Sequence, residues 1–285
     1  FRHSPLFYQF ILVGNCEVLK GGGGSFPIEN FDGRFIGVSL ADFKQARADM
    51  GTSTETTESS INPFLIEAAG ERILVDTGLG GEADAVVAAL AESDLQPTDI
   101  DTVFITHLHP DHFNGLLKVD GTLTYPNATV KIAEKEWNGW LTDEALEKVS
   151  NSDEHLATGL KAKVLPVKDL TSVELLQFGD VLAAGVTLFD AVGHTPGHTG
   201  LMIEAEGEKL FCVVDAAHQT VQMRHPEWSI VFDTDPDATP GTRDRLFSRA
   251  ADEELMTLFH HFPFPGIGTV TRNGNAFRWN PIETT

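Results

Sequence analysis

The stretch 101-DTVFITHLHPDHFNG-115 places three imidazoles and one carboxylate within six consecutive positions, residues 107–112. Its first part, residues 101–106, is apolar and β-branched, which is typical of a buried strand. Side chains two residues apart on a strand point to the same face, so His107 and His109 point the same way. Pro110 lacks a backbone donor and ends the strand. We therefore expect a bend that turns Asp111 and His112 back toward the first two histidines.

The donor types in this stretch indicate a metal site. Imidazole and carboxylate are ligands that suit zinc, iron, manganese and cobalt, and a site without thiolate is typical of catalysis rather than of a structural staple. The alternative is that the histidines only cap the strand end and hydrogen-bond to one another. Four ligands on one short loop cannot all reach one ion without strain, so the stretch predicts two ions. The remaining ligands must then come from other parts of the chain.

The composition is that of a soluble globular protein of one domain, residues 1–285, with 41% hydrophobic and 22% charged residues. No apolar run reaches the length of a membrane span. The formal net charge of −22 argues against a nucleic-acid partner, because phosphate backbones would be repelled. The chain does not begin with Met, so a removed export signal would be invisible. The compartment stays open between cytoplasm and periplasm or secretion.

The N-terminal part, residues 1–49, contains one expected strand at residues 10–13 and a glycine loop at residues 21–24. Apolar side chains follow this loop at Phe26, Ile28, Phe31 and Phe35. One reading packs them against a sheet edge. The other makes this segment a flap that covers the metal pocket.

Strands and helices alternate over the rest of the chain, which predicts a layered α/β fold. We expect hairpins at residues 63–76, 201–214 and 268–279, strands at 128–132 and 186–192, and helices at 82–95, from 113, at 134–148 and at 243–259. Residues 150–168 are expected to be a surface connection, and residues 233–240 a Pro- and Asp-rich loop. Trp137 and Trp140 share one helical face and either pack in the core or line a substrate groove.

The HxHxDH pattern of residues 107–112 resembles the signature of the metallo-β-lactamase-fold hydrolases, and further motifs follow in that family's order. The similar stretches are residues 74–78, 193–198, 211–215 and 261–268. The resemblance implies a four-layer αββα fold, with two mixed β-sheets between helices. It also implies the metal ligands His107, His109, Asp111, His112, His194, Asp215 and His261. Asp215 would bridge two ions, and Asp76 would orient a metal-binding histidine.

Two histidine positions leave a choice. His260 precedes His261, and we favour His261 as the ligand because its distance from Phe264-Pro265-Gly266 matches the related hydrolases. His218 lies three residues after Asp215, where related lactonases have a tyrosine that touches the substrate. His218 is therefore either a surface histidine or a catalytic residue that contacts the substrate or donates a proton.

The predicted chemistry is ester-bond hydrolysis by a hydroxide held between two divalent ions, with Zn²⁺ foremost and Co²⁺, Mn²⁺ or Fe²⁺ as alternatives. Asp215 would hold the hydroxide, and Asp111 would pass a proton to the leaving group. The expected substrate is a small ester, lactone or phosphotriester, and a homodimer is left open.

Several subfamilies fit less well. The two-zinc β-lactamases commonly have Arg at the place of His112, and hydroxyacylglutathione hydrolases have a basic C-terminal region that this acidic chain lacks. The end of the chain is most similar to methyl parathion hydrolases and their N-acyl homoserine lactonase relatives. We expect a lactonase or esterase with phosphotriesterase side activity. Alternatives are a phosphotriesterase as the main activity, a one-iron oxidoreductase of the same fold, or a metal-storing module.

Overall fold

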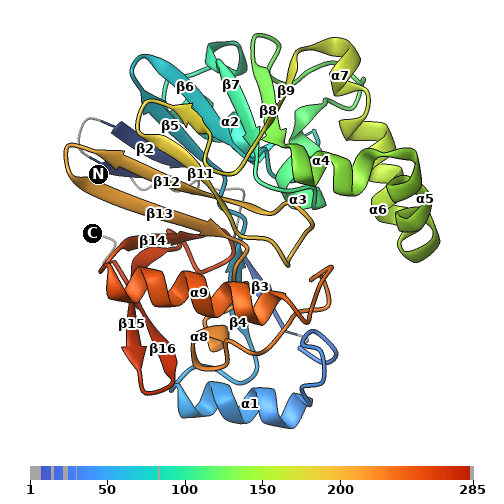
Figure 1. The fold of residues 1–285 in the computed structure, drawn as a ribbon. Helices are drawn as coiled ribbons and strands as arrows, with labels where there is room; N and C mark the ends of the chain where they lie inside the picture. The colour runs from blue at the N-terminus through green and yellow to red at the C-terminus, as the bar shows by residue number, and fades with distance from the viewer. Residues whose placement is uncertain (1–7, 14–15, 22–24, 30, 83, 283–285) are drawn as a thin grey trace.

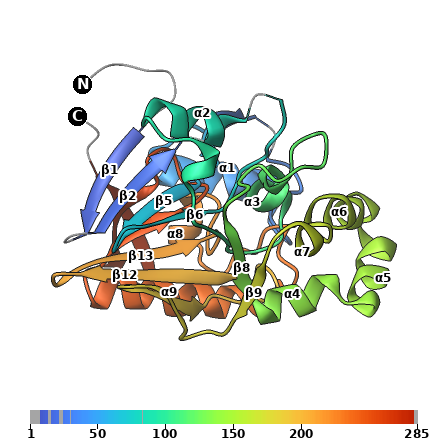
Figure 2. The ribbon, with the colours of Figure 1, turned by 90° about the horizontal axis from the view of Figure 1, so that it is seen from above.

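Two mixed β-sheets lie face to face between layers of helices (Figure 1). The computed structural model describes residues 8–13, 16–21, 25–29, 31–82 and 84–282. Helices α4 to α7 lie together beside the sheets (Figure 2), and α9 runs along the far face of the second sheet (Figure 1). This arrangement confirms the predicted αββα fold.

The first sheet has seven strands in the order β1-β2-β5-β6-β7-β8-β9. Strands β6 to β9 are parallel, so their carboxyl ends meet at one edge, where Asp76 follows β6 and the metal stretch follows β7. The strands are β1 Tyr8–Val13, β2 Cys16–Gly21, β5 Phe64–Ala68, β6 Glu71–Val75, β7 Thr102–Ile105, β8 Thr129–Ala133 and β9 Val173–Leu176.

The second sheet also has seven strands, in the order β10 to β16. Only its central pair, β13 and β14, is parallel, so Asp215 and His260 follow their strands at the same end. The strands are β10 Val181–Ala183, β11 Val186–Asp190, β12 Thr199–Ala205, β13 Glu208–Val214, β14 Met256–Phe259, β15 Ile267–Asn273 and β16 Ala276–Pro281. A separate pair consists of β3 Ser25–Ile28 and β4 Thr57–Ser60.

The helices follow the sheet layers. They are α1 Leu40–Asp49, α2 Ala85–Glu92, α3 Pro110–Phe113, α4 Glu134–Leu141, α5 Asp143–Ser152, α6 Glu154–Gly159, α7 Val167–Leu170, α8 Val221–Arg224 and α9 Thr239–Asp252. Short turns of other helical types cover Pro97–Asp99, Asn114–Leu116 and Leu160–Val164. None of the described helices is long and apolar enough to cross a membrane.

Strand β7 shows why Val103, Phe104 and Ile105, which lead into the metal stretch, are apolar. Val103 and Ile105 point into the core under the helices, whereas Phe104 points into the core between the two sheets. A strand covered on both faces needs apolar side chains at every position. The metal stretch therefore begins from a rigid, completely buried strand.

Three expected elements are wrong. Residues 150–168 are largely helical, because Leu156, Leu160, Val164 and Val167 recur at helical spacing and are buried. The expected helix at 243–259 ends at Asp252, and Met256–Phe259 is a buried strand. The helix expected from residue 113 begins at Pro110, whose fixed φ suits a first helical turn.

The N-terminal segment corrects a fourth expectation. Ile28, Phe31 and Phe35 pack with Phe43 of α1 and with Val221 in a small core of their own, not against a sheet edge. Helix α1 was not predicted. Ile28 also lines the pocket described below. The alternative of a flap over the metal pocket thus fits Ile28, whereas Phe31 and Phe35 are not in the pocket lining. Residues 22–24 and the Phe26 side chain lie outside the described part.

Candidate metal centre

Five histidines from distant segments surround one carboxylate. The Oδ2 atom of Asp215 lies 3.0 Å from Nε2 of His261, 3.3 Å from that of His218, 3.4 Å from those of His112 and His194, and 3.6 Å from that of His107. These histidines follow β7, β11, β13 and β14. The carboxyl ends of these four strands, from both sheets, therefore meet at Asp215.

The predicted donors divide into two groups on either side of Asp215. One consists of His107, His109 and His194, whose ligand atoms lie within 4.8 Å of one another. The other group contains the predicted ligands Asp111, His112 and His261 together with His260. Their ligand atoms also lie within 4.8 Å of one another. Within these groups, His109 Nδ1 is 2.9 Å from His194 Nε2, and Asp111 Oδ2 is 3.3 Å from His261 Nε2.

The donor atoms fit the cations that the family implies. His107 Nε2, His112 Nε2 and Asp215 Oδ1 are buried and have no hydrogen-bond partner among the described residues. Buried polar atoms are normally paired, because leaving one unpaired costs about 1–3 kcal/mol. Nitrogen and oxygen donors that point into one shared space would be satisfied by divalent ions.

Asp76 holds His112 in place from behind, in agreement with its predicted role. Its carboxylate accepts hydrogen bonds from the backbone N–H and the hydroxyl of Thr106, at 2.8 and 2.9 Å. Its Oδ2 also lies 2.8 Å from Nδ1 of His112. With Nδ1 engaged, Nε2 of His112 points into the site.

Asp233 does the same for His194 and was missed from the sequence. Its Oδ1 lies 2.8 Å from Nδ1 of His194, and its Oδ2 accepts a hydrogen bond from the backbone N–H of Ile230 at 3.0 Å. The Pro- and Asp-rich composition of residues 233–240 predicted only a loop. No local signal connects that loop to His194, which lies 39 residues away.

His198 is a further residue whose role was not predicted. Its Nδ1–H donates to the carbonyl of Ala191 at 2.8 Å, and its Nε2 accepts from the backbone N–H of Asp215 at 3.2 Å. Burial and the neighbouring His194 lower the pKa of His198 to about 3, so the imidazole stays neutral. His198 thus positions the backbone that carries Asp215.

The carboxylates set the charge of the histidines in the absence of metal. Burial lowers the pKa of His194, but hydrogen bonds to Asp215 and Asp233 outweigh it and raise the pKa to about 9. Burial acts in the same way on His112, and Asp215 and Asp76 raise its pKa well above the usual value. Burial raises the pKa of Asp215, whereas His261 and His112 hold it well below the usual range. Protons therefore compete with metal ions for this site.

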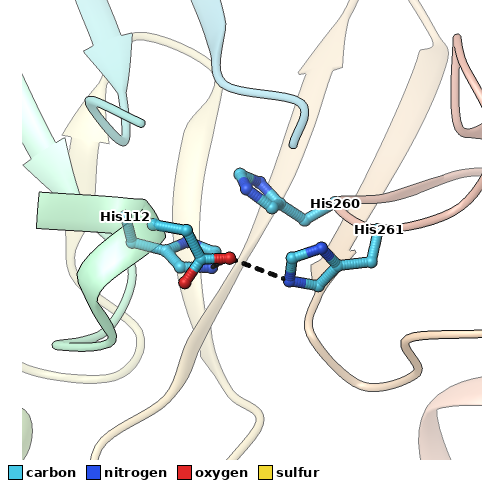
Figure 3. A group of neighbouring side chains, drawn as sticks. His112, His260 and His261 are labelled. Carbon is cyan, nitrogen blue, oxygen red and sulfur yellow. Dashed lines mark ion pairs between the residues drawn. The ribbon is translucent and has the colours of Figure 1, made fainter. Parts of the chain in front are cut away.

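His261, rather than His260, faces Asp215. Its Nδ1–H donates to the backbone carbonyl of Ser60 at 2.9 Å, which directs Nε2 toward Asp215. His260 instead packs its ring over that of His112, with centroids 4.1 Å apart. Figure 3 shows both imidazoles approaching His112 from the opposite side of the site. His261 as a metal ligand stays a prediction, and it is the residue of the pair whose Nε2 faces Asp215.

His218 lies in the site and is not a surface histidine, because only 8% of it is exposed. Its ring stacks on that of His261 with centroids 4.9 Å apart and an angle of 14°. Burial lowers its pKa to about 4, against the opposing effect of Asp215.

A pocket of about 780 Å³ opens onto the centre. Asp111, Asp215, His218 and His261 belong to its lining. Its other walls are mostly apolar and come from several segments, including Ile28, Ile61, Trp140, Leu156, Ile230 and Phe232. Trp140 lines the pocket and is also buried in the core under the helices, so it meets both alternatives. Trp137 is partly buried against that core.

Comparison with known proteins places this site in a family. The dizinc quorum-quenching lactonase AidC aligns with a TM-score of 0.87 and 25% identity, over 98% of both chains. The hydrolase AbOPH of the beta-lactamase superfamily has the same TM-score and 26% identity, over 99% of this chain and 100% of its own.

Curated relatives match over shorter stretches. The exodeoxyribonuclease WalJ of Streptococcus pneumoniae is 34% identical over 117 residues, and the match covers 40% of each chain. An N-acyl homoserine lactonase from a Bacillus species is 27% identical over 180 residues, 54% of this chain and 63% of the relative. The chain thus spans less than two thirds of these relatives.

The family model of the metallo-beta-lactamase superfamily matches residues 56–261, which is more than half of the chain and includes every predicted ligand. Together with the two-sheet fold, this match confirms the resemblance carried by the HxHxDH stretch. The chain belongs to the metallo-beta-lactamase superfamily.

Proposed function

We propose that this protein is a hydrolase with two divalent metal ions that opens lactones, small cyclic esters. The observation that carries the proposal is the position of Asp215, which lies within 3.6 Å of histidines from both groups of donors and lines a mostly apolar pocket. The similarity to AidC over nearly the whole chain supports the lactone as substrate.

The proposed ligands divide between the ions. His107, His109 and His194 would hold the first ion, Asp111, His112 and His261 the second, and Asp215 would lie between them. Zn²⁺ suits this thiolate-free donor set, as do Co²⁺, Mn²⁺ and Fe²⁺. Two such ions, when bound, supply an activated water at neutral pH and polarise the ester carbonyl.

The remaining steps fall to side chains that face the pocket. Asp111 is partly exposed there, with Oδ2 3.3 Å from His261, and is placed to pass a proton to the leaving oxygen. His218 lies beside Asp215 with its ring in the pocket and is placed to contact the substrate. The apolar walls suit an uncharged acyl or aryl group.

Phosphotriester hydrolysis is the second candidate, because the same ions would polarise a phosphoryl oxygen and the apolar walls would accept an aryl group. The similarity to an exodeoxyribonuclease adds DNA as a third substrate to test. The net charge of −22 weighs against DNA, since its backbone would be repelled.

The test is an activity panel on protein with two measured ions per chain. It compares lactones, aryl esters, an aryl phosphotriester, and single- and double-stranded DNA. We expect the highest kcat/KM on a lactone. Faster turnover of the phosphotriester or of DNA would overturn the assignment, and no turnover of any substrate would favour the metal-storing module. One tightly bound iron per chain would favour the oxidoreductase alternative.

A further inference from the structure

Glu136 is a completely buried acid that lies outside both groups of donors. It belongs to the first turn of α4 and accepts four hydrogen bonds. Its Oε1 accepts from the backbone N–H of Leu108 and from Nε1–H of Trp140, both at 2.7 Å. Its Oε2 accepts from the hydroxyl of Thr195 at 2.8 Å and from the backbone N–H of Gly197 at 2.6 Å.

Three of these donors lie on the two loops that carry the first group of histidines. Leu108 is between His107 and His109, and Thr195 follows His194 directly. One carboxylate therefore joins two loops that are 85 residues apart between His109 and His194. Nδ1 of His109 and Nε2 of His194 lie 2.9 Å apart across this junction.

The helix and the second loop pack so closely that side chains are excluded at two places. A Cβ atom at Gly197 would clash with the backbone nitrogen of Glu136. A Cβ atom at Gly139 would lie 2.6 Å from Cβ of Pro196. Both positions are glycine, so the loop can dock directly against α4. This close approach brings the Glu136 carboxylate within reach of both loops.

The second group of donors is held by different residues. His112 is oriented by Asp76, and His261 by the carbonyl of Ser60. Neither contact involves α4 or Glu136. A change at Glu136 should therefore act on one group and leave the other.

We propose that Glu136 is a positioning residue that sets the separation of the two loops and so determines the affinity for the ion held by His107, His109 and His194. The inference rests on the proposed two-ion site. Buried side chains that orient metal ligands typically affect metal affinity by about 10–100-fold.

The test is a stepwise titration of metal-depleted protein with Co²⁺ in the presence of a competing chelator. The visible absorption of the protein-bound Co²⁺ reports how much of each site is filled. Glu136→Gln keeps the side-chain volume but replaces one acceptor oxygen with an NH₂ donor. That donor then faces an N–H group of one of the two loops and cannot accept a hydrogen bond from it. We expect two ions per chain in the wild type. In the variant, one ion should bind about 10–100-fold more weakly while the other keeps its affinity.

Two further variants control the result. Glu147→Gln makes the same change of charge at an exposed position of α5 and should leave both affinities unchanged. Thr195→Val keeps the carboxylate and removes one donor, so it should weaken the same ion by a smaller factor. Thr195→Val also tests the inference if Glu136→Gln does not fold.

Equal weakening of both ions would overturn the inference, because it would indicate a general loss of structure. Wild-type affinity for both ions in Glu136→Gln and Thr195→Val would overturn it as well. Fewer than two ions in the wild type would instead reject the proposed two-ion function. The wild-type protein thus tests the proposed two-ion function, and the variants test the role of Glu136.

Discussion

The Nε2 atom of His261 lies 3.0 Å from Oδ2 of Asp215, although the two residues are 46 positions apart. Strands β13 and β14 are parallel neighbours, so the residues after them emerge at the same sheet edge. His261 is then fixed from behind by the carbonyl of Ser60. This relation makes His261 the residue of the His260-His261 pair that faces both Asp215 and Asp111.

Replacing the two neighbouring histidines separately should distinguish their roles. His261→Ala should lower the affinity for the second ion by at least about 100-fold, since it removes a proposed ligand and not only a supporting contact. His260→Ala should leave two ions per chain, because its ring packs on His112 and does not face Asp215. Elemental analysis of both variants after dialysis measures this. The reverse pattern would exchange the assignments of the two histidines.

Asp76→Asn should weaken the second ion selectively. The backbone φ of Asp76 is +62°, and Asn tolerates this left-handed conformation, so the fold should be retained. The amide cannot supply the negative charge that orients His112, and we expect about 10–100-fold weaker binding of one ion.

The same Co²⁺ titration would measure this effect, with the other ion of each sample as the internal control. If Asp76→Asn weakened the same ion as Glu136→Gln, the division of the donors into two groups would be contradicted. Unchanged binding of both ions would remove Asp76 from the site.

Metal affinity should rise with pH between about 6 and 9. In the metal-free protein the pKa of His194 is raised to about 9, so at pH 7 its imidazole carries the extra proton. Metal binding must displace that proton, and the displacement becomes easier as pH rises toward the pKa. Each displaced proton changes the logarithm of the affinity by about one per pH unit.

Calorimetry at pH 7 in two buffers with different ionisation enthalpies counts the protons released on metal binding. We expect net release. The raised pKa of His112 adds to it, whereas His198, with a pKa of about 3, has no proton to lose at this pH. Net uptake of protons, or an affinity independent of pH, would contradict the protonated metal-free centre.

Arg243→Ala should destabilise the protein without removing any proposed metal ligand. The guanidinium of Arg243 is completely buried and donates to the carbonyls of Ala216, Pro226 and Trp228 at 2.6, 2.7 and 2.9 Å. Each carbonyl left unpaired costs about 1–3 kcal/mol, and we expect a total loss of roughly 3 kcal/mol or more.

Urea unfolding of the metal-free protein measures this loss. Arg245→Ala on the same helix is the matched control, because Arg245 is exposed and donates to a single carbonyl, that of Asp190. Its effect should stay within about 1 kcal/mol. Equal stability of Arg243→Ala and the wild type would show that the segment from Ala216 to Trp228 does not depend on Arg243.

The sequence by itself determined the directions of the local ligands and the order of the motifs. A strand period of two places His107 and His109 on one face, and Pro110 begins the turn that carries Asp111 and His112. Both follow from the geometry of a few consecutive residues. Hairpins with alternating apolar residues were predictable for the same reason.

Tertiary structure decided which side chains support the ligands. Asp233 lies behind His194, and Glu136 holds two loops of different strands. These contacts depend on which strands are neighbours and on how α4 docks, and local spacing does not encode either. The same holds for Met256–Phe259. Its apolar residues fit the end of a helix as well as a strand, and the pairing with β13 and β15 makes it a strand. Local chemistry thus identifies candidate donors, whereas contacts with distant segments determine how each donor is positioned.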